Sequence, residues 1–250
     1  MHIEVVTLFP EMIRAGLAAG VIGRALAGGL IRVGTEDPRL LATDPHRTVD
    51  DRAYGGGPGM VMKVEPLASA IRACAGRLPE GSPAIGLSAQ GRPFTQQVAR
   101  RLTGLRGMML VAGRYEGIDQ RVVDQLIDEE LSIGVYVVSG GELPALVVID
   151  AVARLLPGVL GDAESAAQDS FGDGLLDWPQ YTRPEVWEGH LVPAVLQGGN
   201  HAEIRRWRLK QALGRTWQRR PDLLTARALT GEERALLDEY CAEAGIVPPR

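Results

Sequence analysis

The sequence contains little cysteine and little histidine. Its 250 residues include two cysteines, Cys74 and Cys241, and four histidines. Two cysteines far apart in the chain are typical of unpaired thiols in a reducing compartment, so we expect a cytoplasmic protein without disulfides. Because no cysteines or histidines occur at the paired spacing of a zinc site, we expect no structural metal.

Long hydrophobic runs are also missing. Charged residues or glycines interrupt every apolar stretch well before the ~20 residues that a membrane-spanning helix needs. The first residues have the pattern of a β-strand and lack the basic and apolar regions of a cleavable signal. We therefore expect no membrane segment and no signal peptide. Hydrophobic residues make up 45% of the chain, which is enough for a substantial core.

Several common motifs are absent as well. The chain has no GxxxxGK[ST] phosphate-binding loop and no GxSxG turn, and the glycines of residues 55–59 lack the GxGxxG spacing of a dinucleotide site. The net charge of −4 differs from that of a uniformly basic nucleic-acid binder, and we expect no DNA partner. Basic residues gather instead between Asn200 and Arg220, where there are seven basic residues and one acidic residue.

Hydrophobic periodicity predicts an α/β fold. Strands and helices alternate along the first 160 residues, which favours a mostly parallel sheet with helices on both faces. The expected strands are residues 3–8, 30–33, 84–87, 108–112 and 131–138. The expected helices are residues 11–27, 66–75, 94–102, 120–127 and 143–156. The last of these is apolar nearly all round, so we expect it to be buried on several sides.

The sequence changes character after residue 160. We expect a first domain at residues 1–160, a polar and flexible linker at 161–175, and a small α-helical domain at 176–250. Helices of this second domain are expected at residues 203–219, 221–229 and 231–244. A long polar and glycine-rich loop is expected within the first domain, at residues 35–62.

Three expected strands each end in a glycine-bearing loop, at residues 88–91, 113–117 and 139–144. In open α/β sheets, ligands bind beyond the carboxyl ends of the strands. Glycine allows the backbone to approach a ligand closely and to adopt positive φ. These loops therefore predict a site for a flat, nucleoside-like molecule.

The same segments resemble a known family, the bacterial tRNA (guanine-N1)-methyltransferases called TrmD, which belong to the SPOUT class. The similarity runs from Met1 to about Glu243. Its motifs lie at residues 46–60, 113–117, 132–144, 177–184 and 207–211. The resemblance implies a SPOUT sheet with a deep trefoil knot, and it implies methylation of N1 of the guanosine immediately 3′ of the anticodon of tRNA.

The resemblance also implies a cofactor, S-adenosylmethionine. Backbone groups and apolar walls suit an adenine ring, which agrees with the glycine loops. The residues at cofactor-binding positions are Leu87, Ser88, Gly113, Tyr115, Glu116, Ile133, Gly134, Val135, Tyr136, Val137, Val138, Gly140, Gly141 and Pro144. The family also uses Mg²⁺, and Glu116 is a candidate neighbour of that ion, although no firm metal ligand is expected.

Two residues match the family's catalytic positions. Attack by N1 of guanine requires a general base to remove its proton and a cation to stabilise the charge that develops on O6. By resemblance, Asp169 is the base and Arg154 stabilises O6. The family's homodimer shares its active sites, so Asp169 is expected to act across the interface.

Recognition of the tRNA anticodon stem-loop is expected from both domains. Arg205, Arg208, Arg215 and Arg219 share one face of the expected helix at 203–219, while Leu209, Leu213 and Trp217 share the face that should pack on the core. Phosphate contacts from such a basic face supply affinity without sequence specificity. By resemblance, Asp50, Pro58 and Gly59 line the guanine pocket, and Arg183 contacts RNA.

Three residues depart from the usual family pattern. Ala89 replaces a common proline, Val135 replaces a frequent aspartate, and Gln180 replaces a histidine, which puts any role of that histidine in doubt. Two other functions remain open on the sequence. One is a related SPOUT enzyme that methylates ribose or ribosomal RNA, and the other is a non-catalytic RNA-binding protein with the same fold.

Overall fold

A five-stranded parallel sheet forms the centre of the N-terminal part of the protein. The computed structural model describes residues 1–161 and 168–248 and divides into two compact units, Met1–Ala163 and Glu164–Arg250. In the first unit the strand order is β2-β1-β6-β5-β7, with every neighbouring pair parallel. The strands are β1 (His2–Val6), β2 (Arg32–Glu36), β5 (Ala84–Pro93), β6 (Gly107–Ala112) and β7 (Glu129–Ser132).

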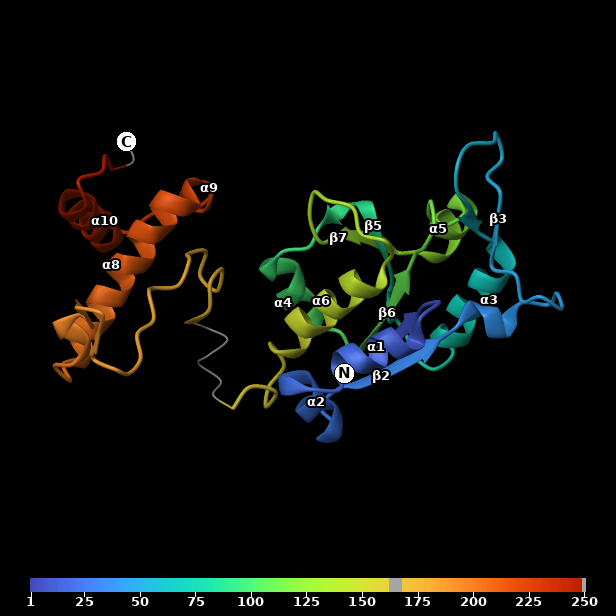
Figure 1. Ribbon diagram of the computed structural model, residues 1–250, viewed down its shortest axis with the longest axis horizontal. Helices are drawn as coiled ribbons and strands as arrows, with labels where there is room; N and C mark the ends of the chain where they lie inside the picture. The colour runs from blue at the N-terminus through green and yellow to red at the C-terminus, as the bar shows by residue number, and fades with distance from the viewer. Residues whose placement is uncertain (162–167, 249–250) are drawn as a thin grey trace. The chain divides into compact units, whose positions relative to one another are not determined.

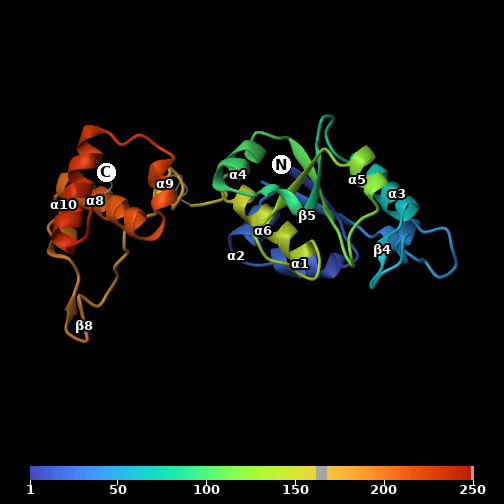
Figure 2. The ribbon, with the colours of Figure 1, turned by 90° about the horizontal axis from the view of Figure 1, so that it is seen from above.

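Helices cover both faces of this sheet, as Figure 1 and Figure 2 show. One face packs on α1 (Pro10–Leu17), α2 (Gly20–Ala27), α4 (Gln96–Thr103) and α6 (Glu142–Ala153). The other packs on α3 (Val64–Ala75) and α5 (Gln120–Leu126). Side chains alternate along a strand, so Ile3 and Val5 of β1 face the first group while Val6 faces the second. The predicted α/β fold is confirmed, and the trefoil knot stays a prediction.

The expected single helix at residues 11–27 is wrong, because it consists of two helices. α1 ends at Leu17 and α2 begins at Gly20. Gly20 has φ of +67°, a left-handed value that interrupts a right-handed helix. The expected strand at 30–33 also shifts, since β2 begins at Arg32.

The strand expected at residues 131–138 is too long. β7 ends at Ser132, and Gly134 follows with φ of +157°. Val135 and Val137 are almost fully exposed, so their β-branched side chains do not face a core. Residues 133–141 therefore form a loop. The expected loop at 35–62 contains short elements, namely η1 (Pro38–Leu41), β3 (Asp50–Asp51) and β4 (Val61–Met62).

The apolar helix α6 is buried on several sides, as its sequence predicted. Val148, Ile149 and Val152 are fully buried against the sheet. One side stays partly open, where Leu143 and Val147 lie one turn apart and each is 46% exposed.

The C-terminal unit packs its helices around a small apolar core. Its elements include α8 (His201–Arg219), α9 (Pro221–Thr225), α10 (Gly231–Ala244), η2 (Ala194–Leu196) and the two-residue strands β8 (Val186–Trp187) and β9 (His190–Leu191). Leu213 is fully buried, with Leu209 and Trp217 packed beside it, so this face of α8 lies on the core as expected. Leu175 joins the same core. Residues 162–167, part of the expected linker, lie outside the described residues.

Both cysteines are buried and unpaired. Burial raises the pKa of the Cys74 thiol to about 12, which makes its reactive thiolate form rare at neutral pH. No helix among the described residues is both long and apolar enough to cross a membrane.

Candidate functional site

A pocket of about 300 Å³ opens at the ends of the central strands. β5 and β6 stop pairing at Leu87 and Ala112. The loop expected at residues 88–91 is wrong, because β5 runs on to Pro93 through an irregularity between Leu87 and Arg92. Ser88, Ala89 and Gln90 of this strand line the pocket together with the loop that follows β6. The loop at 133–141 and the start of α6 complete the wall. Every residue expected at a cofactor position lines this pocket except Val135, whose side chain is fully exposed. Its replacement of a frequent aspartate therefore lies outside the pocket wall.

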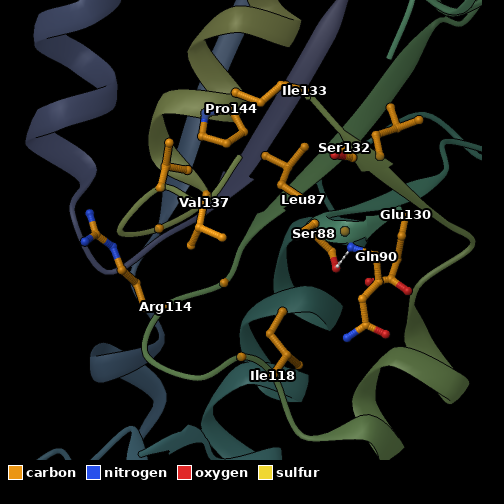
Figure 3. Close-up of a pocket in the computed structure, with 18 of the residues that line it drawn as sticks. Leu87, Ser88, Gln90, Arg114, Ile118, Glu130, Ser132, Ile133, Val137 and Pro144 are labelled. Carbon is orange, nitrogen blue, oxygen red and sulfur yellow. Dashed lines mark hydrogen bonds between the residues drawn. The ribbon is translucent and has the colours of Figure 1, made fainter. Parts of the chain in front are cut away.

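The pocket has an apolar side and a polar side (Figure 3). Leu87, Ile133 and Pro144 line the apolar side, which suits the faces of an aromatic ring. Ser88, Gln90 and Glu130 lie together on the other side, where the Gln90 backbone N–H donates to Ser88 Oγ at 3.1 Å.

Sequence reasoning missed several residues of the wall. Gln90 lies in the segment 88–91, but neither its residue type nor its position singles it out in the sequence. Glu130 precedes the expected strand, so its position gave no signal of a pocket residue. Arg114 lies in the motif at residues 113–117, where the sequence gives no indication of its role. Ala89, where the family commonly has proline, also lines the pocket.

Two glycines allow the loops of the pocket to approach one another. The Gly141 N–H donates to the Gly113 carbonyl at 2.9 Å. A Cβ atom on Gly141 would lie 2.5 Å from Cα of Ala112, which is backbone and has no room to give way. A Cβ atom on Gly140 would lie 2.2 Å from Nε of Arg114. The wall is therefore bare backbone at these positions, as close binding of a nucleoside-like ligand requires.

The expected RNA-binding residues of the first unit lie beside this pocket. Tyr115, at φ of +61°, has its pKa raised by burial and by the neighbouring Asp50 carboxylate. The Glu116 N–H donates to the Met60 carbonyl at 2.9 Å. A Cβ atom on Gly59 would lie 2.3 Å from Oε1 of Glu116. The structure thus brings Asp50 and Gly59 to the edge of the pocket, with Pro58 exposed next to Gly59.

A second pocket, of about 250 Å³, lies within the C-terminal unit. Its wall includes Asp169 together with Trp178, Arg205 and Arg208. The Arg208 guanidinium lies over the Trp178 ring, 4.8 Å from its centroid. Arg208 is therefore packed on an aromatic ring, and its Nε atom is buried with no hydrogen-bond partner among the described residues, unlike an arginine on an open basic face.

Comparison with known proteins identifies the family. The family model of tRNA (Guanine-1)-methyltransferase TrmD matches residues 1–226. The chain belongs to this family. A relative named tRNA (guanine-N(1)-)-methyltransferase from Methylococcus capsulatus is 61% identical over 97% of each chain. A relative with the same name from Pectobacterium carotovorum is 60% identical over 97% of each chain. Another, from Aeromonas salmonicida, is 58% identical over 97% of this chain and 98% of its own.

The two expected catalytic residues of this TrmD-family chain lie in different units. Arg154 follows the last turn of α6 in the first unit and is half-buried. Asp169 belongs to the second unit and is also half-buried. Of the other expected RNA contacts, Arg183, Arg205 and Arg219 are exposed and Arg215 is half-buried. Gln180, the departure from the family's histidine, is exposed.

Within residues 1–161 and 168–248, no three histidine, cysteine, aspartate or glutamate side chains gather closely enough to hold an ion. Glu116 lines the first pocket, and its place beside a Mg²⁺ ion stays a prediction.

Proposed function

We propose that this protein methylates N1 of the guanosine immediately 3′ of the anticodon of tRNA, with S-adenosylmethionine as methyl donor. The observation that carries the proposal is the pocket of glycine loops at the strand ends, in a chain of the TrmD family. The tRNA substrate and the two unpaired cysteines support a site of action in the cytoplasm.

The pocket fits the proposed cofactor. Its volume suits a small ligand, and the glycine backbone permits contacts that side chains would block. Leu87, Ile133 and Pro144 would hold the adenine ring, while Ser88, Gln90 and Glu130 offer polar groups to the rest of the molecule. When bound, S-adenosylmethionine supplies a methyl group carried on a positively charged sulfur.

The protein's own residues would prepare the guanine. Asp169 accepts the proton from N1, which leaves a lone pair for attack on the methyl carbon. Arg154 stabilises the negative charge that spreads onto O6 and thereby makes the N1 proton more acidic. We propose the homodimer that the family resemblance implies, in which Asp169 of one subunit completes the site that contains Arg154 of the other.

Binding of tRNA would use both units. Arg183, Arg205, Arg215 and Arg219 would contact phosphates of the anticodon stem-loop, so affinity should fall as salt rises. Arg208 on Trp178 offers a planar cation and an aromatic surface near Asp169. Asp50, Pro58 and Gly59 would meet the target base, which must leave the stack of the loop to reach the pocket.

The test is methyl transfer from radiolabelled S-adenosylmethionine onto an unmodified tRNA transcript. We expect label in 1-methylguanosine after digestion to nucleosides, and no label when the guanine 3′ of the anticodon is replaced by adenine. Label in a 2′-O-methyl nucleoside would favour a ribose methyltransferase. No label with either transcript, together with no cofactor binding by calorimetry, would favour a non-catalytic RNA-binding protein.

A further inference from the structure

A buried carboxylate lies next to the cofactor pocket without lining it. Glu142, the first residue of α6, is fully buried. Its Oε1 accepts a hydrogen bond from the Thr7 hydroxyl at 2.7 Å, and its Oε2 accepts one from Arg114 Nε at 2.8 Å. The position at a helix N-terminus favours a negative charge, and both oxygens are occupied by donors. This carboxylate is therefore satisfied inside the protein, although it does not line the pocket.

Arg114 connects this carboxylate to both cofactor loops. It belongs to the loop at 113–117, and its Nη1 donates to the carbonyl of Ser139 in the loop at 133–141 at 3.1 Å. Its guanidinium also lies over the Phe9 ring, 4.3 Å from the centroid. Arg114 and Gly140 form an isolated antiparallel bridge. One side chain thus joins two loops of the pocket wall.

Thr7 links the same carboxylate to the central strand. Its hydroxyl donates to Glu142 and accepts the N–H of Phe9 at 2.9 Å. Thr7 is fully buried and follows β1 directly, so the carboxylate is held at a fixed distance from the sheet. The chain of contacts runs from the sheet through Thr7 and Glu142 to Arg114, and from there to the loop carbonyl.

We propose that Thr7, Glu142 and Arg114 form a loop clamp, which sets the separation of the two cofactor loops before the cofactor binds. This inference rests on the proposed function, because it concerns affinity for S-adenosylmethionine. Thr7 and Glu142 do not line the pocket and act as positioning residues through Arg114. When the loops are already ordered, less of the binding free energy is lost in ordering them. Loss of the clamp therefore weakens cofactor binding.

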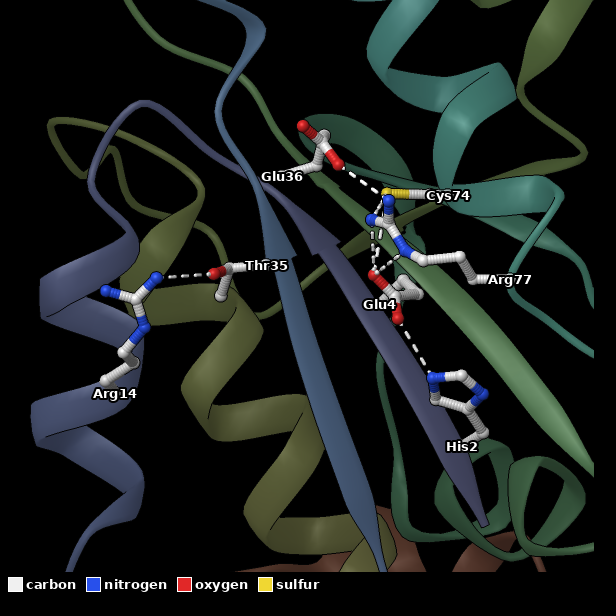
Figure 4. A network of polar contacts seen from close by, with 7 residues as sticks. All are labelled: His2, Glu4, Arg14, Thr35, Glu36, Cys74 and Arg77. Atoms are coloured by element: carbon white, nitrogen blue, oxygen red, sulfur yellow. Dashed lines mark hydrogen bonds and ion pairs between the residues drawn. The ribbon is translucent and has the colours of Figure 1, made fainter. Parts of the chain in front are cut away.

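A second ion pair in the same unit provides a matched control (Figure 4). Glu4 on β1 is 3% exposed and accepts from Arg77 Nη2 at 2.7 Å and from Nε at 3.2 Å. His2 Nε2 lies 2.9 Å from the other oxygen. This pair has the same chemistry, a buried glutamate with an arginine, but it lies on the face of the sheet that α3 covers and none of its residues lines the pocket.

The experiment compares E142Q, T7V, T7S and R114K with E4Q in the full-length protein. Glutamine at position 142 replaces one accepting oxygen with an NH₂ group, which cannot accept a hydrogen bond from Thr7 or Arg114. Valine at position 7 removes the hydroxyl that donates to Glu142. We expect E142Q and T7V to weaken S-adenosylmethionine binding in calorimetry about tenfold or more, because each breaks a buried charged hydrogen bond. T7S should keep wild-type affinity, and R114K should lie between, since lysine cannot bridge both acceptors.

Thermal unfolding without ligand separates positioning from general stability. E4Q should lower the unfolding temperature as E142Q does, but it should leave cofactor affinity unchanged. Equal affinity of T7V and wild type, or an equal loss of affinity in E4Q and E142Q, would overturn the loop clamp. If E142Q does not fold, T7V and R114K decide the question. A wild-type protein that does not bind S-adenosylmethionine would instead contradict the proposed function.

Discussion

At the scale of single residues, Gly141 is a position of the pocket wall that has no room for a side chain. Its φ of −75° is accessible to any residue, so space alone requires glycine. A methyl group there would meet the backbone of Ala112 at 2.5 Å. We expect G141A to lower the free energy of unfolding by about 1–3 kcal/mol, as overpacked sites do, and to weaken cofactor binding. Denaturant unfolding and calorimetry measure the two effects.

Gly231 is the matched control for this substitution. It is the first residue of α10, and a Cβ atom there meets nothing within 4 Å. G231A should therefore change the free energy of unfolding by no more than a few tenths of a kcal/mol. It should leave cofactor binding unchanged. Wild-type stability and affinity in G141A would mean that the loops separate more easily than their packing indicates.

The proposed catalytic residues make a second prediction at this scale. D169N removes the general base and R154A removes the cation at O6, so we expect each to lower kcat by about 100-fold or more. Neither residue is in the cofactor pocket wall, so the affinity for S-adenosylmethionine should stay near wild type. Single-turnover methyl transfer and calorimetry separate the two quantities. The exposed residues Asp238 and Arg24 provide controls, D238N and R24A, whose turnover should not change.

At the scale of elements, one cluster of charges ties α8 to α10. Lys210, 7% exposed, donates to Glu239 at 2.9 Å and to Glu243 at 2.8 Å, and Arg206 pairs with Glu239 as well. Hydrogen bonds from Arg206 and then Lys210 lower the pKa of Glu239 from 4.5 to about 2. A carboxylate with a depressed pKa stabilises the folded state above its unfolded value and loses this contribution as the pH falls.

This cluster predicts a pH dependence. E239Q should be less stable than wild type at pH 6, by about 1 kcal/mol or less because the side chain is about one third exposed. The difference should shrink as the pH falls from about 4.5 towards 2, since the wild-type carboxylate becomes protonated there. Thermal unfolding followed at several pH values measures this. A difference that stays constant down to pH 2 would show that Glu239 contributes through packing and not through charge.

The elements also show how far the sequence could predict this structure. Alternating apolar segments were enough for a parallel sheet with helices on both faces, because burial imposes that pattern. The end of β7 was not predictable in this way, since Val135 and Val137 have the β-branched side chains typical of a strand but are almost fully exposed. The break between α1 and α2 was missed because apolar spacing continues through Gly20, where one left-handed residue redirects the chain.

The site likewise contains features that the sequence predicts and features that only the fold creates. The glycines after the strands predicted the pocket, because few other residues allow such close backbone contact. The loop clamp was not predictable, since Thr7, Arg114 and Glu142 are far apart in the sequence and only folding brings them together. Likewise, helical spacing placed Arg208 on a basic face but gave no sign of Trp178 beneath its guanidinium.

At the scale of the whole molecule, the proposal of shared active sites depends on how two subunits combine. Arg154 and Asp169 lie in separate units of one chain, so a site could be completed either within a subunit or across a dimer. In the N-terminal half of α6, at the other end of the helix from Arg154, Leu143 and Val147 leave apolar surface partly exposed, which a second subunit could cover. Mutating one residue in each of two subunits distinguishes the two arrangements.

R154A and D169N proteins, each nearly inactive alone, should regain activity when they are mixed and allowed to exchange subunits. In a mixed dimer with shared sites, one site carries both substitutions, while the other takes its Arg154 from the D169N subunit and its Asp169 from the R154A subunit. Because half of the dimers are mixed and each has one intact site, activity should reach roughly a quarter of wild type. If each subunit completes its own site, every site in the mixture carries one substitution, and no activity should return. A mixture that remains as inactive as its components, although native mass spectrometry detects mixed dimers, would therefore place Asp169 in the same subunit as the Arg154 that it serves.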